Sequence, residues 1–123
     1  MFVVDHLAPP SAPTISGYEV GQRLSVGDVV VLACTASVPG GALSWYRGGG
    51  ESVDQRPLNS TCNTTTMGNG DVTSTCRLTL VSRPDHNGAV YSCTASYGDS
   101  DIAMTSSIRL TVLCEYTFSQ EIA

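Results

Sequence analysis

The cysteines are the first residues in this chain that could carry chemistry, because a thiolate can act as a nucleophile, a metal ligand or a disulfide partner. The chain has 123 residues and five cysteines. A zinc site needs about four converging Cys or His ligands, yet no two cysteines have Cys-x-x-Cys spacing. Of the two histidines, His6 falls in a predicted linker and His86 in a predicted turn. The pattern therefore indicates no metal centre, and we expect no cofactor.

An enzyme active site is the next class of site to consider. A catalytic nucleophile needs a base held against it and a group that orients the base. His86 follows Asp85, but neighbours in a turn do not form a dyad, so we interpret His86 as a solvated turn residue. Asp99 and Asp101 place two carboxylates in a short hairpin turn, too few for a calcium loop. We therefore expect no enzymatic activity.

Composition narrows the class of partner. Charged residues make up 14% of the chain, below the usual quarter, and the formal net charge is −5 at pH 7. Nucleic acid binding needs clustered Lys and Arg, and here the arginines are scattered, so we expect no nucleic acid partner. No apolar run approaches the ~20 residues that span a bilayer. Five cysteines fit an oxidising compartment, but the first residues do not resemble a signal peptide, so a secreted protein would be represented by a fragment.

Short apolar runs bounded by Gly, Pro, Asn and Asp predict β-strands, and no segment has the sustained 3.6-residue period of a helix. Turns are expected at residues 39–41 and 98–101. The predicted strands span residues 13–18, 28–36, 42–47, 74–81, 89–97 and 106–112. Alternation along these strands directs one set of residues to a common core: Val30, Leu32, Cys34, Cys76, Leu78, Leu80, Tyr91, Cys93, Ala95, Ile108, Leu110 and Val112. About seven strands with regular turn signals predict an all-β fold, a two-sheet antiparallel sandwich.

The run from Cys62 to Cys76, CNTTTMGNGDVTSTC, contains a strong hairpin signal at residues 68–70. A three-residue loop, with Gly70 in the left-handed bulge position, pairs Met67 with Asp71 and sets the two cysteines directly opposite each other. A two-residue loop would shift the register and separate them diagonally. Opposed residues have Cα atoms about 4.5 Å apart, near the lower limit for a disulfide. A Cys62–Cys76 disulfide therefore favours the three-residue loop, and alternation then directs both cysteines toward the core side.

Two N-glycosylation sequons lie beside this hairpin, at residues 59–61 and 63–65, although a chain rich in Ser and Thr can carry unused sequons by chance. Asn59 and Asn63 have the alternation opposite to that of Cys62, so both are expected to face solvent. Our hypothesis is that Cys62–Cys76 staples a hairpin at a sheet edge while glycans shield its outer face. Cys114 has no evident partner in the chain, and it could pair with a neighbouring domain or a second chain.

One constellation is more specific than the strand pattern. Trp45 follows Cys34 by eleven residues, Cys93 lies 59 positions after Cys34, and Tyr91 precedes Cys93 by two. Over residues 13–113 the sequence resembles an immunoglobulin domain of the I-set or C2-like type, a Greek-key sandwich. The resemblance implies that Cys34 and Cys93 bridge the two sheets and that Trp45 packs on this disulfide. It also implies a tyrosine corner, in which the Tyr91 hydroxyl bonds to backbone near Pro84 or Asp85.

The family motif Asp-x-Gly/Ala-x-Tyr-x-Cys is altered in this chain. It reads NGAVYSC, so Asn87 stands where the family has Asp. A salt bridge formed by that Asp would therefore be absent or moved.

The start of the chain resembles a junction between domains of nephrin-like, nectin-like and sidestep-like adhesion receptors. Residues 1–12 would then be the end of a preceding domain and a Pro-rich linker, 13–113 the immunoglobulin-like domain, and 114–123 a tail. The resemblance implies an extracellular protein-binding module of a cell-surface receptor, with a homophilic or heterophilic protein partner and no direct membrane contact. The alternatives are a secreted or surface innate-immune molecule that binds a soluble or microbial ligand through the loops at 39–41, 48–54 and 98–101, or a structural spacer.

In such receptors the sheet that carries the third, sixth and seventh strands commonly binds the partner. Tyr46 is the expected anchor, because aromatic residues dominate interface energetics, and Arg109 lies on the same face. Near the predicted 98–101 hairpin, Tyr97, Ile102 and Met104 would add apolar contact. The plain alternative is an ordinary solvated sheet. The residues expected to point outward from this sheet are Ser44, Tyr46, Val90, Ser92, Thr94, Arg109 and Thr111.

Overall fold

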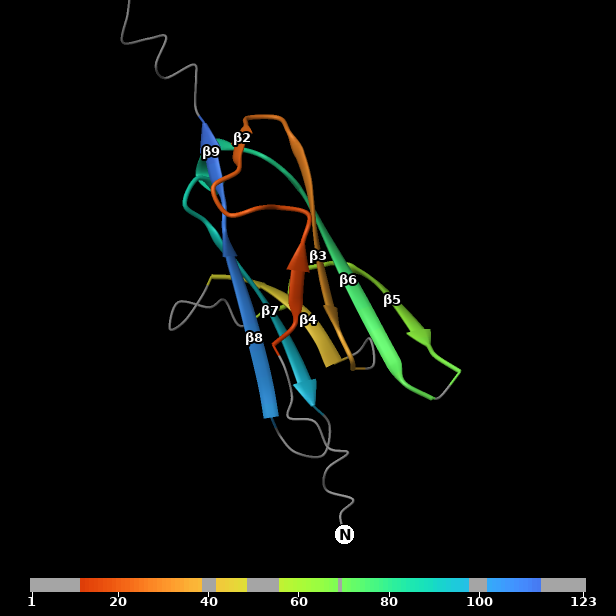
Figure 1. The fold of residues 1–123 in the computed structure, drawn as a ribbon. Coiled ribbons are helices and arrows are strands. Elements are labelled where there is room, and N and C mark those ends of the chain that lie inside the picture. Colours follow the sequence, from red (N-terminus) through yellow and green to blue (C-terminus); the bar gives the residue numbers. More distant parts are fainter. Residues whose placement is uncertain (1–11, 39–41, 49–55, 69, 98–101, 114–123) are drawn as a thin grey trace, which may run out of the picture.

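Short strands account for almost all regular structure in residues 12–38, 42–48, 56–68, 70–97 and 102–113, the parts of the chain that the computed structural model describes (Figure 1). In chain order they are β1 (Thr14–Ser16), β2 (Arg23–Ser25), β3 (Val29–Ala36), β4 (Leu43–Arg47), β5 (Thr61–Thr66), β6 (Val72–Val81), β7 (Val90–Tyr97), β8 (Ile102–Arg109) and β9 (Thr111–Leu113). A 3₁₀ turn, η4 (Pro84–His86), precedes β7. The predicted linker at residues 1–11 and the tail from Cys114 lie outside the described residues.

The strands form two antiparallel layers, in which several neighbouring strands are not consecutive along the chain. One sheet has the order β1-β3-β6-β5, and the other has the order β4-β7-β8. Beyond β8 the chain continues as β9, which pairs in parallel with β2. The step between β8 and β9 falls at Leu110, whose N–H donates to the Ala89 carbonyl at 2.9 Å. The prediction of an all-β, two-sheet antiparallel sandwich is confirmed.

The core lies between the layers and is built from alternate residues of each strand. In β3, for example, Val30, Leu32 and Cys34 are buried, while Val29 and Val31 are exposed. This alternation follows from the two-residue period of a strand with one face on a core. The residues predicted to point inward are buried except two: Leu80 is half-buried and packs against the core, and Cys62 is exposed.

Two strand assignments differ from the sequence prediction. The pattern missed β2, whose three residues hold one apolar side chain, Leu24, too few to show alternation. It also started the last long strand at Ser106, whereas β8 begins at Ile102 and pairs with β7 from there. Pairing with a long neighbour extends β8 through a stretch without a clear two-residue pattern.

Candidate functional site

Two disulfides lie in one cross-section of the sandwich. Cys34–Cys93 joins the sheets with a Cα–Cα distance of 6.5 Å, and Cys62–Cys76 joins β5 to β6 with a Cα–Cα distance of 4.0 Å. Cys76 is also the cross-strand neighbour of Cys34 in the β3–β6 ladder. Because both pairs are oxidised, none of these four sulfurs is available as a thiolate nucleophile or metal ligand.

The hairpin that carries Cys62–Cys76 has the register predicted for a three-residue loop. Cys62 pairs with Cys76 and Thr66 with Val72. The Met67 N–H donates to the Asp71 carbonyl at 2.7 Å, and Gly70 has φ of +93°. A positive φ is why glycine is needed at this bulge position.

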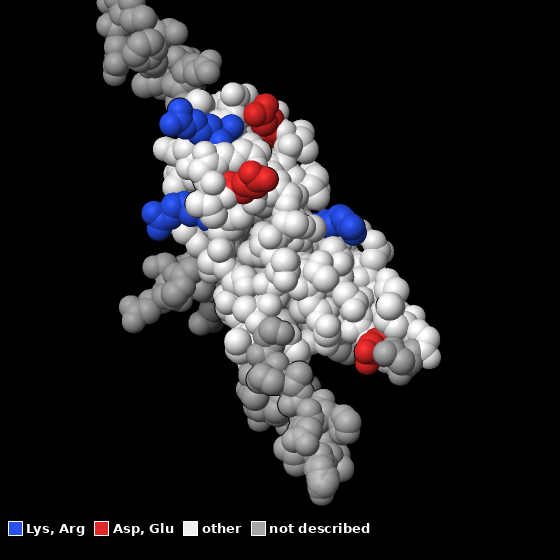
Figure 2. All heavy atoms as spheres, viewed as in Figure 1, with Lys and Arg blue, Asp and Glu red and all other residues white. Residues whose placement is uncertain are grey.

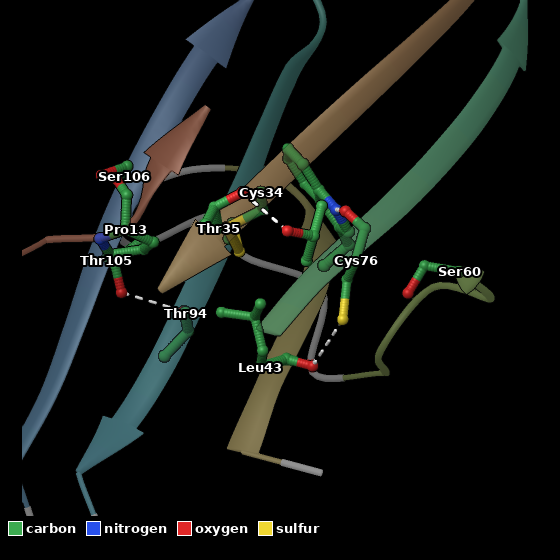
Figure 3. Close-up of a disulfide and its surroundings, with 12 residues drawn as sticks. Pro13, Cys34, Thr35, Leu43, Ser60, Cys76, Thr94, Thr105 and Ser106 are labelled. Atoms are coloured by element: carbon green, nitrogen blue, oxygen red, sulfur yellow. Dashed lines mark hydrogen bonds between the residues drawn. A yellow bond between two sulfur atoms is a disulfide. The ribbon is translucent and has the colours of Figure 1, made fainter. Parts of the chain in front are cut away.

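Cys62 lies on the same side of the sheet as Cys76, as predicted, but it is exposed. Cys76 is fully buried, but all six residues of β5 are exposed. The β5–β6 hairpin projects to one side of the other layer (Figure 1), so none of the described strands of that layer lies over β5. The Cys76 Sγ lies 3.6 Å from the Leu43 carbonyl oxygen (Figure 3). A disulfide sulfur has no hydrogen to donate, so this is a packing contact.

Trp45 connects the two disulfides. It is fully buried and is the cross-strand partner of Cys93. Its indole Nε1–H donates to the Cys76 carbonyl at 3.0 Å, which satisfies the one polar atom that burial of a tryptophan must pair. The aromatic ring therefore couples the inter-sheet bridge to the strand that bears the second bridge.

His86 is a structural residue of η4, and its interpretation as a solvated turn histidine was wrong. It is only 7% exposed, its Nδ1 accepts the Arg83 N–H at 3.2 Å, and its ring meets Tyr91 edge to face. Asp85 faces solvent and pairs with Arg83 at 3.6 Å. The described residues contain no group of three or more His, Cys, Asp or Glu side chains that could hold a metal ion.

Tyr91 is buried against charged and aromatic neighbours. The guanidinium of Arg47 lies 5.8 Å from the centre of its ring, and the same guanidinium donates to the Asp85 carbonyl at 3.3 Å. Desolvation by burial raises the pKa of Tyr91, and the nearby Arg47 opposes that rise. The hydroxyl bond of a tyrosine corner stays a prediction.

Asn87 has a backbone-capping role that sequence reasoning missed. Its Oδ1 accepts the N–H of Val112 in β9 at 3.1 Å. The amide oxygen thus holds the last strand against the segment before β7. The sequence did offer a signal for this role, since Asn87 replaces the Asp of the family motif. A short polar side chain at such a position often hydrogen-bonds nearby backbone.

Replacing Asn87 by alanine should lower the free energy of unfolding by about 1 kcal/mol, the usual net value of one hydrogen bond. Asn87→Asp keeps an acceptor oxygen at the same place and should lose less. Urea unfolding of the two variants and the parent chain measures both values. Equal losses for the two variants would show that the contact with Val112 does not hold β9.

The outer face of the β4-β7-β8 sheet is a flat array of small polar side chains. Two rows cross it: Ser44, Thr94 and Thr105 are register partners, as are Tyr46, Ser92 and Ser107. Thr94 and Thr105 share a hydrogen bond of 2.9 Å between their hydroxyls (Figure 3). Arg109 pairs with Val90 at the end of the sheet and is exposed. We define this surface, from Ser44 to Arg109, as the hydroxyl face.

A directed chain of hydrogen bonds orders the centre of the hydroxyl face. The Ser92 hydroxyl donates to the Gly48 carbonyl at 2.5 Å and also bonds the Ser107 hydroxyl at 2.8 Å. A hydroxyl has one hydrogen, so Ser107 must be the donor in the second bond. Ser92 has the outward register that was expected, but it is only 1% exposed.

Comparison with known proteins agrees with this geometry. A family model described as immunoglobulin domain matches residues 12–112. The chain belongs to the immunoglobulin superfamily. No curated protein matches the sequence.

A solved structure shows the same fold as this immunoglobulin domain. A structure titled "Crystal Structure of Rst D1-D2" superposes with a TM-score of 0.65 at 19% sequence identity, covering 85% of this chain and 50% of that one. The chain therefore spans half of that structure. An IgNAR antibody domain C1 gives a TM-score of 0.46 at 24% identity, covering 83% of this chain and 95% of that one. Among the described residues, no helix is long and apolar enough to cross a membrane.

The register of the immunoglobulin domain separates the residues proposed to contact a partner. Tyr46 and Arg109 lie on the hydroxyl face, Tyr46 half-buried and Arg109 exposed. Tyr97 and Met104 have the opposite alternation, shared with the buried Ala95. Both are partly exposed, and Tyr97 packs against the core. Ile102 pairs with Tyr97 through the backbone. The five residues therefore do not form one surface, and Tyr46 and Arg109 remain as the candidates on the hydroxyl face.

Three further assignments concern residues outside the part of the chain that the structure describes. They are Asp99 and Asp101 in the predicted hairpin turn, the loops suggested for a soluble ligand at 39–41, 49–54 and 98–101, and Cys114.

Proposed function

We propose that this immunoglobulin domain is an extracellular protein-binding module of a cell-surface adhesion or recognition receptor, and that the hydroxyl face contacts the partner. The ordered hydroxyl array, with Tyr46 in the same row as Ser92 and Ser107, is the observation that carries this proposal. Among the residues that define the hydroxyl face, which are the two rows and the Val90–Arg109 pair, Arg109 is the only charged one. A partner would therefore desolvate few charges on docking, and buried unpaired charges are the costliest part of an interface.

Preorganisation favours this face over a generic solvated sheet. The side chains of Ser92 and Ser107 are already held by hydrogen bonds, so little rotamer entropy is lost when a partner covers them. Tyr46 offers a large ring at low entropic cost, and tyrosine is enriched among residues that dominate binding energy. Two disulfides support an oxidising, extracellular setting.

Beads coated with the chain should aggregate if the partner is a second copy, and should bind cells that display the partner if it is heterophilic. Tyr46→Ala should weaken whichever binding occurs by about thirtyfold or more, because residues that dominate interfaces contribute about 2 kcal/mol or more. The matched control is Val31→Ala, an exposed residue on the outer face of the other sheet. Thermal unfolding of both variants confirms that they are folded.

Binding that survives Tyr46→Ala but is lost in Val31→Ala would place the contact on the β1-β3-β6-β5 sheet and contradict the proposal. The absence of both bead aggregation and saturable cell binding would overturn the proposal in favour of a spacer.

A further inference from the structure

Among the strands that the structure describes, β5 is an open sheet edge. It lies last in the order β1-β3-β6-β5. The short Cα–Cα distance of 4.0 Å between Cys62 and Cys76 marks a pair that exchanges no backbone hydrogen bonds. Bonded and non-bonded pairs alternate, and the bonded Met67–Asp71 pair fits this phase. The N–H and C=O groups of Cys62, Thr64 and Thr66 therefore point away from β6.

The amino-acid sequence of β5 contains no feature that would keep this edge from pairing with another strand. Its sequence, TCNTTT, has no charge and no proline, and all six residues pair regularly with β6. Threonine favours strands. Natural sheets usually blunt an exposed edge with lysine, proline, a bulge or a covering segment. By contrast, β1 is only three residues long and follows Pro13.

The two sequons lie at this edge and on one face. Asn63 sits in the middle of β5, between the outward backbone groups of Cys62 and Thr64, and Asn59 lies two residues before the strand. Both side chains are exposed. Neither asparagine lies on the hydroxyl face, because Asn63 is in β5 of the other sheet and Asn59 lies beside Arg77 and Thr79 of β6.

A polar hollow of about 360 Å³ adjoins Asn59. It is lined by Asn59, Ser60, Thr61, Arg77 and Thr79. The hollow is open to solvent, and its hydroxyls and guanidinium can hydrogen-bond a sugar ring. A group attached to Asn59 can therefore lie against the sheet without displacing core residues.

We propose that Asn59 and Asn63 carry N-linked glycans and that the glycan on Asn63 keeps the β5 edge from pairing with a second copy of the chain. The donor is a lipid-linked oligosaccharide pyrophosphate of the secretory pathway. The asparagine amide nitrogen bonds to the anomeric carbon of the first sugar and loses a proton. The bond from that carbon to the pyrophosphate oxygen breaks, and the lipid pyrophosphate leaves.

The first test measures occupancy on the whole chain, secreted from eukaryotic cells behind an added signal sequence. Peptide N-glycosidase F in ¹⁸O-labelled water converts each glycosylated asparagine to labelled aspartate, which peptide mass spectrometry locates. We expect label at Asn59 and Asn63. Asn59→Gln and Asn63→Gln should each remove one glycan. The proposal is overturned if the protein is secreted with its disulfides formed but neither Asn59 nor Asn63 carries the label.

The second test separates the glycan from the edge. Asn63→Gln and Thr65→Ala both remove the sequon and leave the edge open, so both should form dimers or larger species by light scattering with size exclusion. Thr64→Pro also abolishes the sequon, since proline is not allowed at the middle position. However, it removes only an N–H that faces away from β6. Thr64→Pro should therefore lose the Asn63 glycan and remain monomeric. Asn59→Gln keeps the Asn63 glycan and should also remain monomeric.

Asn63→Lys provides a second edge-blocking variant if Thr64→Pro does not fold, because it loses the glycan but adds a charge to the edge. A monomeric Asn63→Gln protein would overturn the edge-protection role. Self-association of every variant that lacks the Asn63 glycan, including Thr64→Pro and Asn63→Lys, would equally overturn it, because the contact would then not use the β5 edge. Neither result bears on the hydroxyl face, which Tyr46→Ala tests separately.

Discussion

Replacing Gly17 by alanine should lower the free energy of unfolding by about 3 kcal/mol or more, a loss seen for few single substitutions. Gly17 follows β1 and has φ of +96°. A side chain in the left-handed region costs roughly 1–2 kcal/mol by itself. In addition, a Cβ at this position would lie 2.0 Å from the carbonyl oxygen of Val31. Backbone of β1 or β3 would have to move, because no flexible side chain can give way.

Gly27→Ala is the matched control. Gly27 has nearly the same backbone conformation, φ of +99°, but a Cβ there would meet nothing within 4 Å. It should therefore lose only the conformational part, roughly 1–2 kcal/mol. Urea unfolding under non-reducing conditions measures both variants. If the two losses were equal, the close approach of β1 to β3 at Val31 would not constrain the domain.

The strand pattern and the cysteine register were predictable because both depend on short-range rules. A buried face requires alternate apolar residues, so Val30, Leu32 and Cys34 could be assigned to the core from sequence. The hairpin around Gly70 has few loop geometries, so its length determined which residues face Cys76. Each inference needs only neighbours along the chain or across one turn.

The errors arose where burial depends on the opposite layer or on neighbouring side chains. Alternation correctly gave Cys62 the same side as Cys76, but it could not show that β5 extends beyond the other sheet. Ser92 has outward alternation, yet its neighbours bury it. His86 was taken as a solvated turn residue because its partner, Tyr91, was not recognised as a neighbour. These cases are tertiary effects that a period in the sequence does not encode.

The sparse charge of the surface could also be predicted in part. Composition gave a low charged fraction, but it did not indicate where the charges would lie. In the view of Figure 2 most charged side chains gather toward the end that carries β2 and β9, and much of the described surface is uncharged. Composition thus indicated few charged side chains, while only the fold placed Tyr46 among hydroxyl groups.

Removing the Cys34–Cys93 disulfide should be the most destabilising change in the domain. Cys34→Ala with Cys93→Ala opens a loop with a sequence separation of 59, for which chain entropy predicts a loss of about 4 kcal/mol. Both cysteines are fully buried beside Trp45, so lost packing adds to this value. Cys62→Ala with Cys76→Ala opens a loop with a separation of only 14 and should cost about 3 kcal/mol or less.

The two bridges should also differ in how readily they are reduced in the folded protein. A thiolate must reach a sulfur atom to exchange with it, and Cys62 is exposed whereas Cys34 and Cys93 are buried between the sheets. Low concentrations of dithiothreitol should therefore open Cys62–Cys76 first, as measured by alkylation and peptide mass spectrometry over time. Both pairs should be compared in a Cys114→Ser background, so that a fifth thiol cannot exchange with either bridge. Simultaneous labelling of all four cysteines would contradict this order, because it would mean that reduction follows global unfolding and not local exposure of β5.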